Sequence, residues 1–303
     1  MTWRRRRSYP WGVDLVDAGA KFLELAAKAS QSFGRALSNR ELAARLERIP
    51  NQLGPYGVDA FGFDPRYLQR FLGLGAWAYS RYFRCQTYGI ENIPAGRCIL
   101  VGNHSGQLPY DGAMIATAVF LRGEPPRVVR AMVERFVPST PFVSPFLARC
   151  GQVLGTPANC RRLLANEEII QIFPEGTHGL NKTWRSRYQL QRFGQGFMRM
   201  AMEMRAPIVP VAVIGAEEQA PTLANLRGLA RLLGLPALPL TLAPLGGLIP
   251  LPSRYRIYFG TPQLFHGDAN DDDDLIVPKV DSVRATLQTM IERGLAAREH
   301  IFW

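Results

Sequence analysis

The chain has 303 residues, of which 47% are hydrophobic and 20% charged, so it can bury a full core and is neither disordered nor collagen-like. Its 36 lysines and arginines exceed its 25 aspartates and glutamates, and the formal net charge of +11 predicts a polyanionic partner. The sequence has no zinc-finger spacing, helix-turn-helix signature or aromatic RNA-binding motif. This argues against nucleic acid and favours anionic phospholipid.

Nothing in the sequence predicts a membrane-spanning or secretory segment. The N-terminal arginine cluster, residues 4–7, is followed by Pro10, Asp14 and Asp17 instead of the apolar run of a signal peptide. The longest uncharged run, residues 232–252, contains five prolines. We therefore expect a cytoplasmic protein, bound peripherally to the inner face of the membrane. Its four widely spaced cysteines are expected to be reduced thiols.

Two stretches with helical periodicity precede the first predicted strand. The first covers residues 13–49 and carries a stripe of apolar side chains. The second, residues 65–83, mixes aromatic residues with arginines, which fits either an interfacial helix or a helix that covers the core. We predict that residues 1–85 form an N-terminal helical extension that associates with a membrane surface, and that residues 86–303 form the main domain.

From residue 89 onward, short apolar runs rich in β-branched residues alternate with helical stretches. This alternation predicts an α/β fold with a mostly parallel β-sheet flanked by helices, after the N-terminal helical extension. The strands are predicted at residues 98–101, 127–133, 152–154, 169–173, 208–214 and 255–259. The helices are predicted at residues 111–121, 157–166, 194–205 and 281–300, with the acidic residues 271–274 as a solvated loop instead of a metal site.

The segment Ile99-Leu-Val-Gly-Asn-His-Ser-Gly-Gln-Leu-Pro-Tyr-Asp111 joins a buried strand to the next helix. Ligands of open α/β sheets bind at the carboxyl ends of strands, so His104 is predicted at the functional edge. A neutral imidazole there can accept a hydroxyl proton if a carboxylate fixes its tautomer, and Asp111 is the nearest carboxylate in sequence. On the alternative interpretation, Asp111 is only a helix N-cap and His104 is a turn residue bonded to backbone.

Three further segments follow predicted strands at the same edge. Residues 172–177, Ile-Phe-Pro-Glu-Gly-Thr, predict a tight turn that presents Glu175, Thr177 and backbone N–H groups able to hold an oxyanion or a phosphate. Residues 215–218 end the next strand in a comparable way. Residues 151–162 add polar and cationic groups nearby.

With these motifs, residues 90–260 resemble the lysophospholipid and glycerol-phosphate acyltransferase superfamily, typified by bacterial 1-acylglycerol-3-phosphate acyltransferase. The most specific element is Phe173-Pro-Glu-Gly-Thr177, preceded by Asn103-His104. The resemblance implies transfer of a fatty acyl group from acyl-CoA or acyl-carrier protein to a glycerolipid hydroxyl. It implies no metal or other cofactor, no covalent acyl-enzyme, and a membrane phospholipid surface as partner.

The resemblance also implies roles for individual residues. His104 becomes the general base and Asp111 the carboxylate that orients it. The family usually places four residues between these two, whereas six intervene here, so the loop has to bulge. Substrate binding is assigned to Asn103, Ser105, Gly106, Phe173, Pro174, Glu175, Gly176 and Thr177.

The acceptor is the least determined part of this interpretation. Where the family usually carries an arginine associated with the acceptor phosphate, this chain has His178. Lys182 is predicted to bind the acceptor instead, and Arg185 and Arg187 are further candidates. Lysophosphatidate, another lysophospholipid and a neutral acylglycerol all stay open as acceptors.

Two other functions stay open. Ser105 beside His104 allows a lipid hydrolase, although the chain has no Gly-x-Ser-x-Gly nucleophile elbow. A non-catalytic lipid-binding or membrane-scaffold protein is the second alternative, since a fold can persist after activity is lost. The apolar run at residues 232–252 is either a loop that faces a membrane or an acyl chain, or a crossover in the core.

Overall fold

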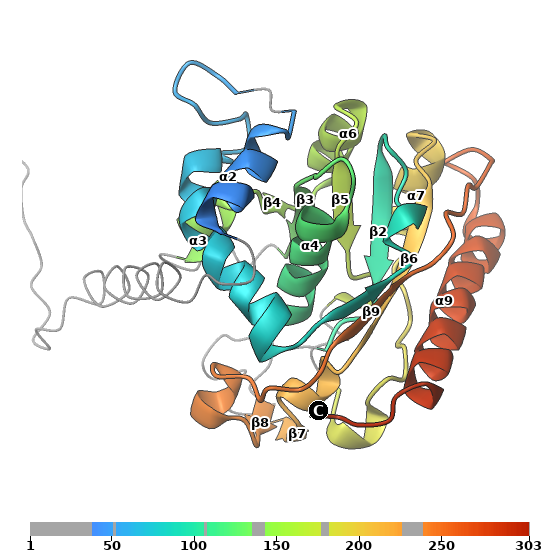
Figure 1. The fold of residues 1–303 in the computed structure, drawn as a ribbon. Coiled ribbons are helices and arrows are strands. Elements are labelled where there is room, and N and C mark those ends of the chain that lie inside the picture. Colours follow the sequence, from blue (N-terminus) through green and yellow to red (C-terminus); the bar gives the residue numbers. More distant parts are fainter. Residues whose placement is uncertain are drawn as a thin grey trace, which may run out of the picture.

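The computed structural model describes residues 38–50, 53–105, 108–134, 143–176, 182–225 and 239–302. A seven-stranded sheet with the order β1-β9-β6-β2-β5-β3-β4 forms the centre, and a separate pair, β7–β8, lies outside it (Figure 1). The strands are β1 Gln86–Tyr88, β2 Cys98–Gly102, β3 Val129–Val133, β4 Val153–Leu154, β5 Ile169–Ile172, β6 Ile208–Ile214, β7 Thr222–Asn225, β8 Pro239–Thr241 and β9 Arg256–Phe259.

Helices cover the sheet and connect its strands. The α-helices are α2 Asn39–Glu47, α3 Pro65–Trp77, α4 Tyr110–Arg122, α5 Val143–Arg149, α6 Pro157–Ala165, α7 Gly196–Glu203 and α9 Asp273–Ala296. The π-helix η1 Ala78–Tyr82 extends α3. The short 3-10 helices are η2 Ile90–Asn92, η5 Trp184–Ser186, η6 Glu217–Gln219 and η7 Pro244–Gly247.

The sheet is mostly parallel, as the alternation of strands and helices predicts. β2 pairs in parallel with β5 and β6, and β3 pairs in parallel with β5 and β4. β9 runs antiparallel to β6, and β1 then runs parallel to β9, so only one side of the sheet is mixed. Every residue of β2 and β6 is buried, which is typical of parallel strands covered on both faces.

Alternate residues of β2 face two different cores. Ile99 and Val101 pack in a core with side chains of α6, α7 and α9. Cys98 and Leu100 pack in the opposite core with side chains of α4 and with Tyr79 of η1. Burial of both faces holds β2 rigidly up to the point where the sequence turns polar.

Both stretches predicted to be helical before β1 are helical where the structure describes them, as α2 and as α3 with η1. The side-chain oxygen of Ser38 accepts the Glu41 N–H at 3.2 Å, and a Glu41 oxygen accepts the Ser38 N–H at 2.7 Å, which caps α2 reciprocally. Leu42 and Leu46 then pack α2 against α3 and the end of α4. Residues 13–37 of the first predicted helix lie outside the described residues.

The aromatic stretch at residues 65–83 forms α3 and η1. Asp64 caps α3 and Pro65 occupies its first turn. Tyr79 and Phe83 are buried in the core. For these two residues, the interpretation as a helix that covers the core holds. In the parts of the chain that the structure describes, no helix is both long and apolar enough to cross a membrane.

The last helix starts earlier than predicted. Asp273 and Asp274 form the first turn of α9, so the prediction of a solvated loop is wrong for these two residues. Negative charge is stabilised at a helix N-terminus by the macrodipole, and Asp273 also pairs with Arg199 at 2.7 Å. The short elements β1, α5, β7 and β8 are not predicted from the sequence, because three to seven residues carry too little periodicity.

Gly294 lets α9 approach the sheet closely. A Cβ atom there would lie 2.8 Å from Ile214 Cγ1 and 3.0 Å from a ring carbon of Tyr258. We expect Gly294→Ala to lower the free energy of unfolding by about 1–3 kcal/mol, because the helix has to move off β6. Urea unfolding measures the change.

Gly196→Ala in α7 is the matched control. Nothing lies within 4 Å of the Cβ position of Gly196. Since alanine forms helix better than glycine, stability should stay constant or rise by up to about 1 kcal/mol. Equal stability of the two variants would contradict the close packing of α9.

Candidate active site

Asn103 determines where the chain leaves β2. Its Nδ2 donates to the Val213 carbonyl at 3.0 Å and its Oδ1 accepts the Val213 N–H at 2.7 Å. The side-chain amide thus acts like one more peptide group of the β2–β6 ladder, while the main chain turns away. Asn103 is buried, and its amide is bonded within the sheet instead of being directed at a substrate.

His104 and Asp111 meet despite the six residues between them. His104 Nδ1 lies 2.8 Å from Asp111 Oδ2, and the Ser105 N–H donates to the same oxygen at 2.8 Å. The two side chains are therefore in direct contact. With the Nδ1 proton held by Asp111, Nε2 becomes the basic nitrogen of the neutral ring. No hydrogen bond joins Nε2 to any of the described residues.

Asp111 belongs to the first turn of α4 and is completely buried. Its Oδ1 accepts the Gly112 N–H at 2.7 Å. The N-terminus of α4 also favours a negative charge at this position. The N-cap of α4 is Pro109, so the alternative interpretation of Asp111 as only a helix N-cap is wrong.

Phe173 holds the plane of the imidazole. Its ring stacks on His104, with centroids 4.5 Å apart and planes inclined by 21°. Two glycines make room for this ring. A Cβ atom on Gly102 would lie 3.0 Å from Phe173 Cε1, and one on Gly112 would lie 3.3 Å from Cε2. Phe173, predicted to bind substrate, contacts His104 directly.

Glu175 and Lys182 form a buried ion pair beside the histidine turn. Lys182 Nζ lies 2.7 Å from Glu175 Oε2 and 3.8 Å from Glu217 Oε1. Glu175 also accepts the Gln191 N–H at 2.9 Å. Lys182 was predicted to bind the acceptor, but the structure places its ammonium group in this pair. An anionic acceptor would have to displace a carboxylate to reach it.

The turn after β5 uses one of its own backbone donors. Gly176 has a φ of 52°, and its N–H donates to the Phe173 carbonyl at 3.0 Å. This N–H closes the turn and is not directed at a substrate oxyanion. Pro174 occupies the same turn. Gly106 and Thr177, both predicted to bind substrate, lie outside the described residues.

A second charged network after β6 was missed by the sequence analysis. Glu218 accepts a hydrogen bond from the Tyr188 hydroxyl and pairs with Arg298 at 2.5 Å. The Tyr188 hydroxyl accepts the Gly215 N–H at 2.7 Å. The position of Glu218 after a strand was the only signal available. Tyr188 and Arg298 belong to no motif.

Gln219 links the site to its surroundings. Its Nε2 donates to Ser105 Oγ at 3.1 Å, and its Oε1 accepts from the Tyr255 hydroxyl. Ser105 Oγ in turn donates to Asp111 Oδ2 at 3.0 Å. A serine nucleophile would donate to the histidine base, so this arrangement argues against a Ser105–His104 hydrolase.

Burial and charge set the protonation of the site. Burial lowers the pKa of His104, but the charge and hydrogen bond of Asp111, together with the Glu175 carboxylate, raise it by more, so the pKa lies above the usual 6.5. Burial raises the pKa of Asp111, but His104 and the hydrogen bonds from Ser105 and Gly112 together lower it by more, so the net pKa is depressed. Burial raises the pKa of Glu217 to about 7 despite the nearby Lys182. His104 can act as a base only above its raised pKa.

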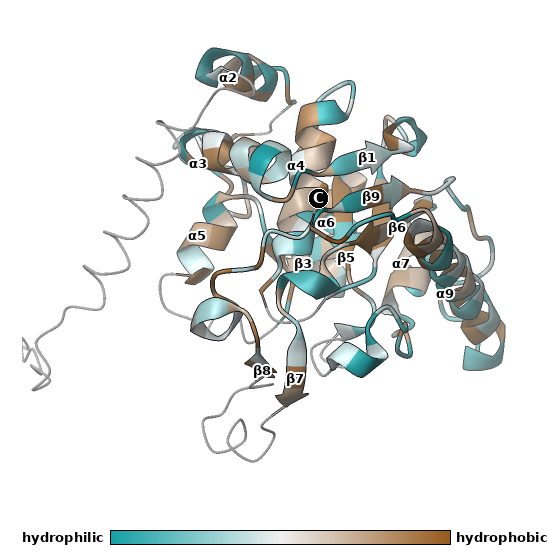
Figure 2. Ribbon diagram, turned by 60° about the horizontal axis from the view of Figure 1, so that its bottom comes forward, coloured by the Kyte–Doolittle hydropathy of each residue, from teal (hydrophilic) through white to brown (hydrophobic). Residues whose placement is uncertain are grey.

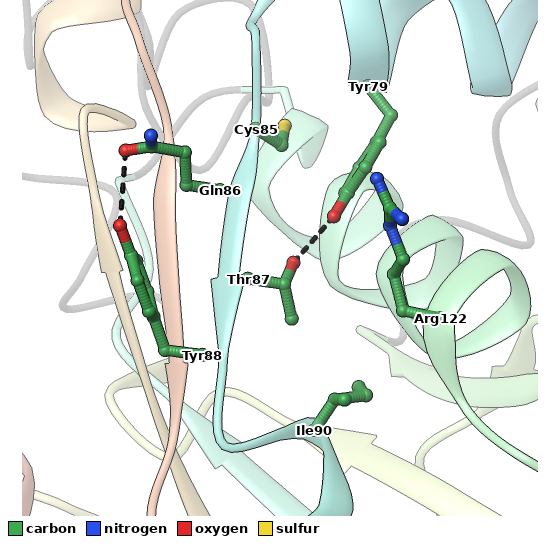
Figure 3. A pocket seen from close by; sticks show the side chains of 7 residues that line it. All are labelled: Tyr79, Cys85, Gln86, Thr87, Tyr88, Ile90 and Arg122. Carbon is green, nitrogen blue, oxygen red and sulfur yellow. Dashed lines mark hydrogen bonds between the residues drawn. The ribbon is translucent and has the colours of Figure 1, made fainter. Parts of the chain in front are cut away.

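Two surface hollows lie away from this pair. The larger, about 440 Å³, is shown in Figure 3, where Tyr79, Thr87 and Arg122 point toward it. Arg122 ends α4, about 16 Å along the helix from Asp111 at 1.5 Å per residue. The other, about 320 Å³, is lined by residues of α9 and of the segment that enters α7. Neither hollow is lined by His104 or Asp111.

Comparison with known proteins identifies the family of this chain. Residues 84–214 match the family model described as Acyltransferase, and this stretch contains His104, Asp111 and the Glu175 turn. Uncharacterized proteins of Mycobacterium tuberculosis and Mycobacterium leprae are each 40% identical to the chain, over 260 and 264 residues. Each match covers 82% of this chain. It covers 73% of the Mycobacterium tuberculosis protein and 71% of the Mycobacterium leprae protein. The chain belongs to the acyltransferase family.

The fold of this acyltransferase also matches a solved structure. The crystal structure of the 1-acyl-sn-glycerophosphate acyltransferase PlsC from Thermotoga maritima superposes with a TM-score of 0.51 and 18% identity. The match covers 76% of this chain and 81% of that one. At this level of identity the match shows the fold. The predicted membership of the superfamily is confirmed.

Replacing Asp111 should shift the titration of His104. In Asp111→Asn, loss of the carboxylate removes the interaction that raises the His104 pKa, so the acidic limb of the pH–rate profile moves to lower pH. The maximal rate should also fall by about 100-fold or more, because asparagine does not stabilise the imidazolium. Nuclear magnetic resonance of the histidine rings, assigned with His104→Ala, measures the pKa independently of activity. An unchanged pKa would contradict the pairing.

The Glu175–Lys182 pair should show strong coupling. Lys182→Met leaves the buried Glu175 carboxylate without its cation and should lower the free energy of unfolding by about 3–5 kcal/mol. Adding Glu175→Gln removes the stranded charge and should restore much of the loss. Urea unfolding of the two single variants and the double variant measures this. Additive effects would show that the two groups do not interact.

Proposed function

We propose that this acyltransferase moves a fatty acyl group from acyl-CoA or acyl-carrier protein to a hydroxyl of a lysophospholipid or another glycerolipid. The observation that carries the proposal is the 2.8 Å contact between His104 Nδ1 and Asp111 Oδ2 at the carboxyl end of β2. It leaves Nε2 as a general base. The net charge of +11 supports work at an anionic lipid surface, with the protein bound peripherally to the inner face of the membrane.

The proposed reaction is a direct acyl transfer. His104 Nε2 takes the proton of the acceptor hydroxyl as that oxygen attacks the thioester carbonyl carbon. The tetrahedral oxyanion collapses, the carbon–sulfur bond breaks, and the thiolate leaves and takes up the proton from His104. Asp111 stabilises the imidazolium formed between these steps, and Phe173 keeps the ring in plane.

The hydrogen bonds of the site argue against the two alternative functions, a hydrolase and a non-catalytic lipid-binding protein. A hydrolase that uses Ser105 is disfavoured because the hydroxyl is bonded to Asp111 and Gln219. A non-catalytic lipid-binding protein has no need for a buried histidine–aspartate pair, whose burial costs free energy unless the charges are compensated. Family membership favours acyl transfer over both.

An acyl-transfer assay with the purified chain tests the proposal. The donors are acyl-CoA and acyl-carrier protein, and the acceptors are a 1-acyl-sn-glycerophosphate, which the PlsC name suggests, other lysophospholipids and monoacylglycerol. We expect acceptor-dependent thiol release that falls by about 10²–10⁴-fold in His104→Ala. Release without an acceptor would indicate a hydrolase, and lipid binding without release would indicate a scaffold.

Ser105→Ala is the matched control for this assay. It removes one hydrogen bond to Asp111 but not the base, so the rate should fall by no more than about tenfold, as for one hydrogen bond of about 1 kcal/mol. A loss in Ser105→Ala equal to that in His104→Ala would instead support a serine nucleophile.

A further inference from the structure

Five aliphatic side chains stay about half exposed on the β7–β8 pair and on the segment that follows it. We name this set the apolar flap: Leu223, Leu240, Leu242, Leu248 and Ile249, with exposed fractions from 48% to 62%. None of them lines either surface hollow. Scattered single leucines on a surface need no explanation, but a contiguous segment of them marks an interaction surface.

Hydrogen bonds hold the apolar flap next to the catalytic turn. The hydroxyl of Tyr110, the residue before Asp111, donates to the Leu248 carbonyl at 2.6 Å. The Leu251 N–H donates to the Gln219 carbonyl at 2.6 Å, and Gln219 itself bonds to Ser105. The flap therefore lies at the edge of the sheet that carries His104, and its main chain is anchored there.

Exposed arginines lie at the same edge. Arg185 and Arg187 lie in and just after η5, and the Arg187 guanidinium lies 4.2 Å from the centre of the Trp184 ring. The flanks of η5 are fixed by the Lys182–Glu175 pair and by the bond of Tyr188 to Gly215. In Figure 1 the yellow segment containing η5 lies beside β7, and Figure 2 shows the hydrophobic colour of β8 at the same end.

We propose that the apolar flap and the η5 arginines form one surface that docks on an anionic phospholipid bilayer, with His104 facing the lipid. Leucines beside arginines and a tryptophan match the acyl region and headgroups of such a bilayer. A second copy of the chain would bring like charges together, and a bound acyl chain alone has no use for the arginines. This docking builds on the proposed function and orients the protein on the membrane. The docking itself does not depend on which acceptor is used.

This surface differs from the N-terminal extension to which membrane binding was assigned. The described part of that extension packs α2 and α3 against the core. The apolar flap belongs to the main domain instead. Docking through it would expose the catalytic edge to lipid, whatever residues 1–37 contribute.

Vesicle binding by the full-length chain tests the surface. The variant Leu240→Gln/Leu242→Gln should bind phosphatidylglycerol–phosphatidylcholine vesicles about tenfold more weakly or worse, since two half-exposed leucines no longer enter the apolar region. The variant Arg185→Gln/Arg187→Gln should lose about fivefold per arginine on these vesicles. It should lose nothing on pure phosphatidylcholine.

The matched control is Leu264→Gln/Leu275→Gln. These leucines are 51% and 57% exposed, and they lie after β9 and in the first turn of α9, at the opposite end of the sheet. This variant should bind like the wild type. His104→Ala should also bind normally, so a failure of docking and a failure of the proposed chemistry are distinguishable.

A fluorescent label reports the orientation. Burial raises the pKa of each native thiol and so slows its reaction, which lets a cysteine introduced as Leu242→Cys be labelled preferentially with an environment-sensitive dye. Anionic vesicles should shift the emission of this label to the blue and leave a label at Leu275→Cys unchanged.

Three outcomes would overturn the proposal. The first is equal vesicle binding by the flap variant and its control. The second is an equal response of the two labels. The third is flap-dependent dimerisation without vesicles, measured by light scattering, which would assign the surface to a second copy.

Discussion

A single buried carboxylate, that of Asp111, organises the turn that follows β2. An unpaired carboxylate in the interior is very unfavourable, so the fold has to supply donors for it. It does so with His104 Nδ1, the Ser105 N–H and hydroxyl, and the Gly112 N–H. The same requirement selects the tautomer of His104 and aligns the start of α4 with the end of β2. The geometry of the His104–Asp111 pair and the compensation of the buried charge are therefore one constraint.

A second constraint is the compensation of Glu175, Glu217 and Glu218 at the neighbouring strand ends. Lys182 and Arg298 neutralise part of this charge, while Tyr188 bridges the two sides through its hydroxyl and its N–H. These cations are therefore occupied by the protein itself. The remaining positive charge at this edge lies at the surface, where it is accessible to solvent or to a membrane.

The His104–Asp111 pair and the apolar flap share one end of the molecule for a topological reason. Parallel strands place their carboxyl ends, and the loops that follow, at a single edge. β2 delivers His104 there, β5 delivers the Glu175 turn, and β6 leads through η6 into β7. The proposed transfer to a lipid hydroxyl needs both a base and an apolar approach, and this topology puts His104 and the apolar flap side by side.

The sequence by itself determined the layered α/β fold, the histidine and the Glu175 turn. Short apolar runs rich in β-branched residues, alternating with helical stretches, indicate strands buried on both faces, and polar residues directly after such strands fall at the functional edge. Local patterns left open whether Asp111 reaches His104 across six residues, and they indicated a substrate role for Lys182.

Only the tertiary structure decided those points, because each depends on partners distant in the chain. Asn103 is bonded to Val213, Lys182 lies between Glu175 and Glu217, and Glu218 meets Arg298, 80 residues away. Compensation of buried charge acts through space between separate elements, and no periodicity along the chain records it.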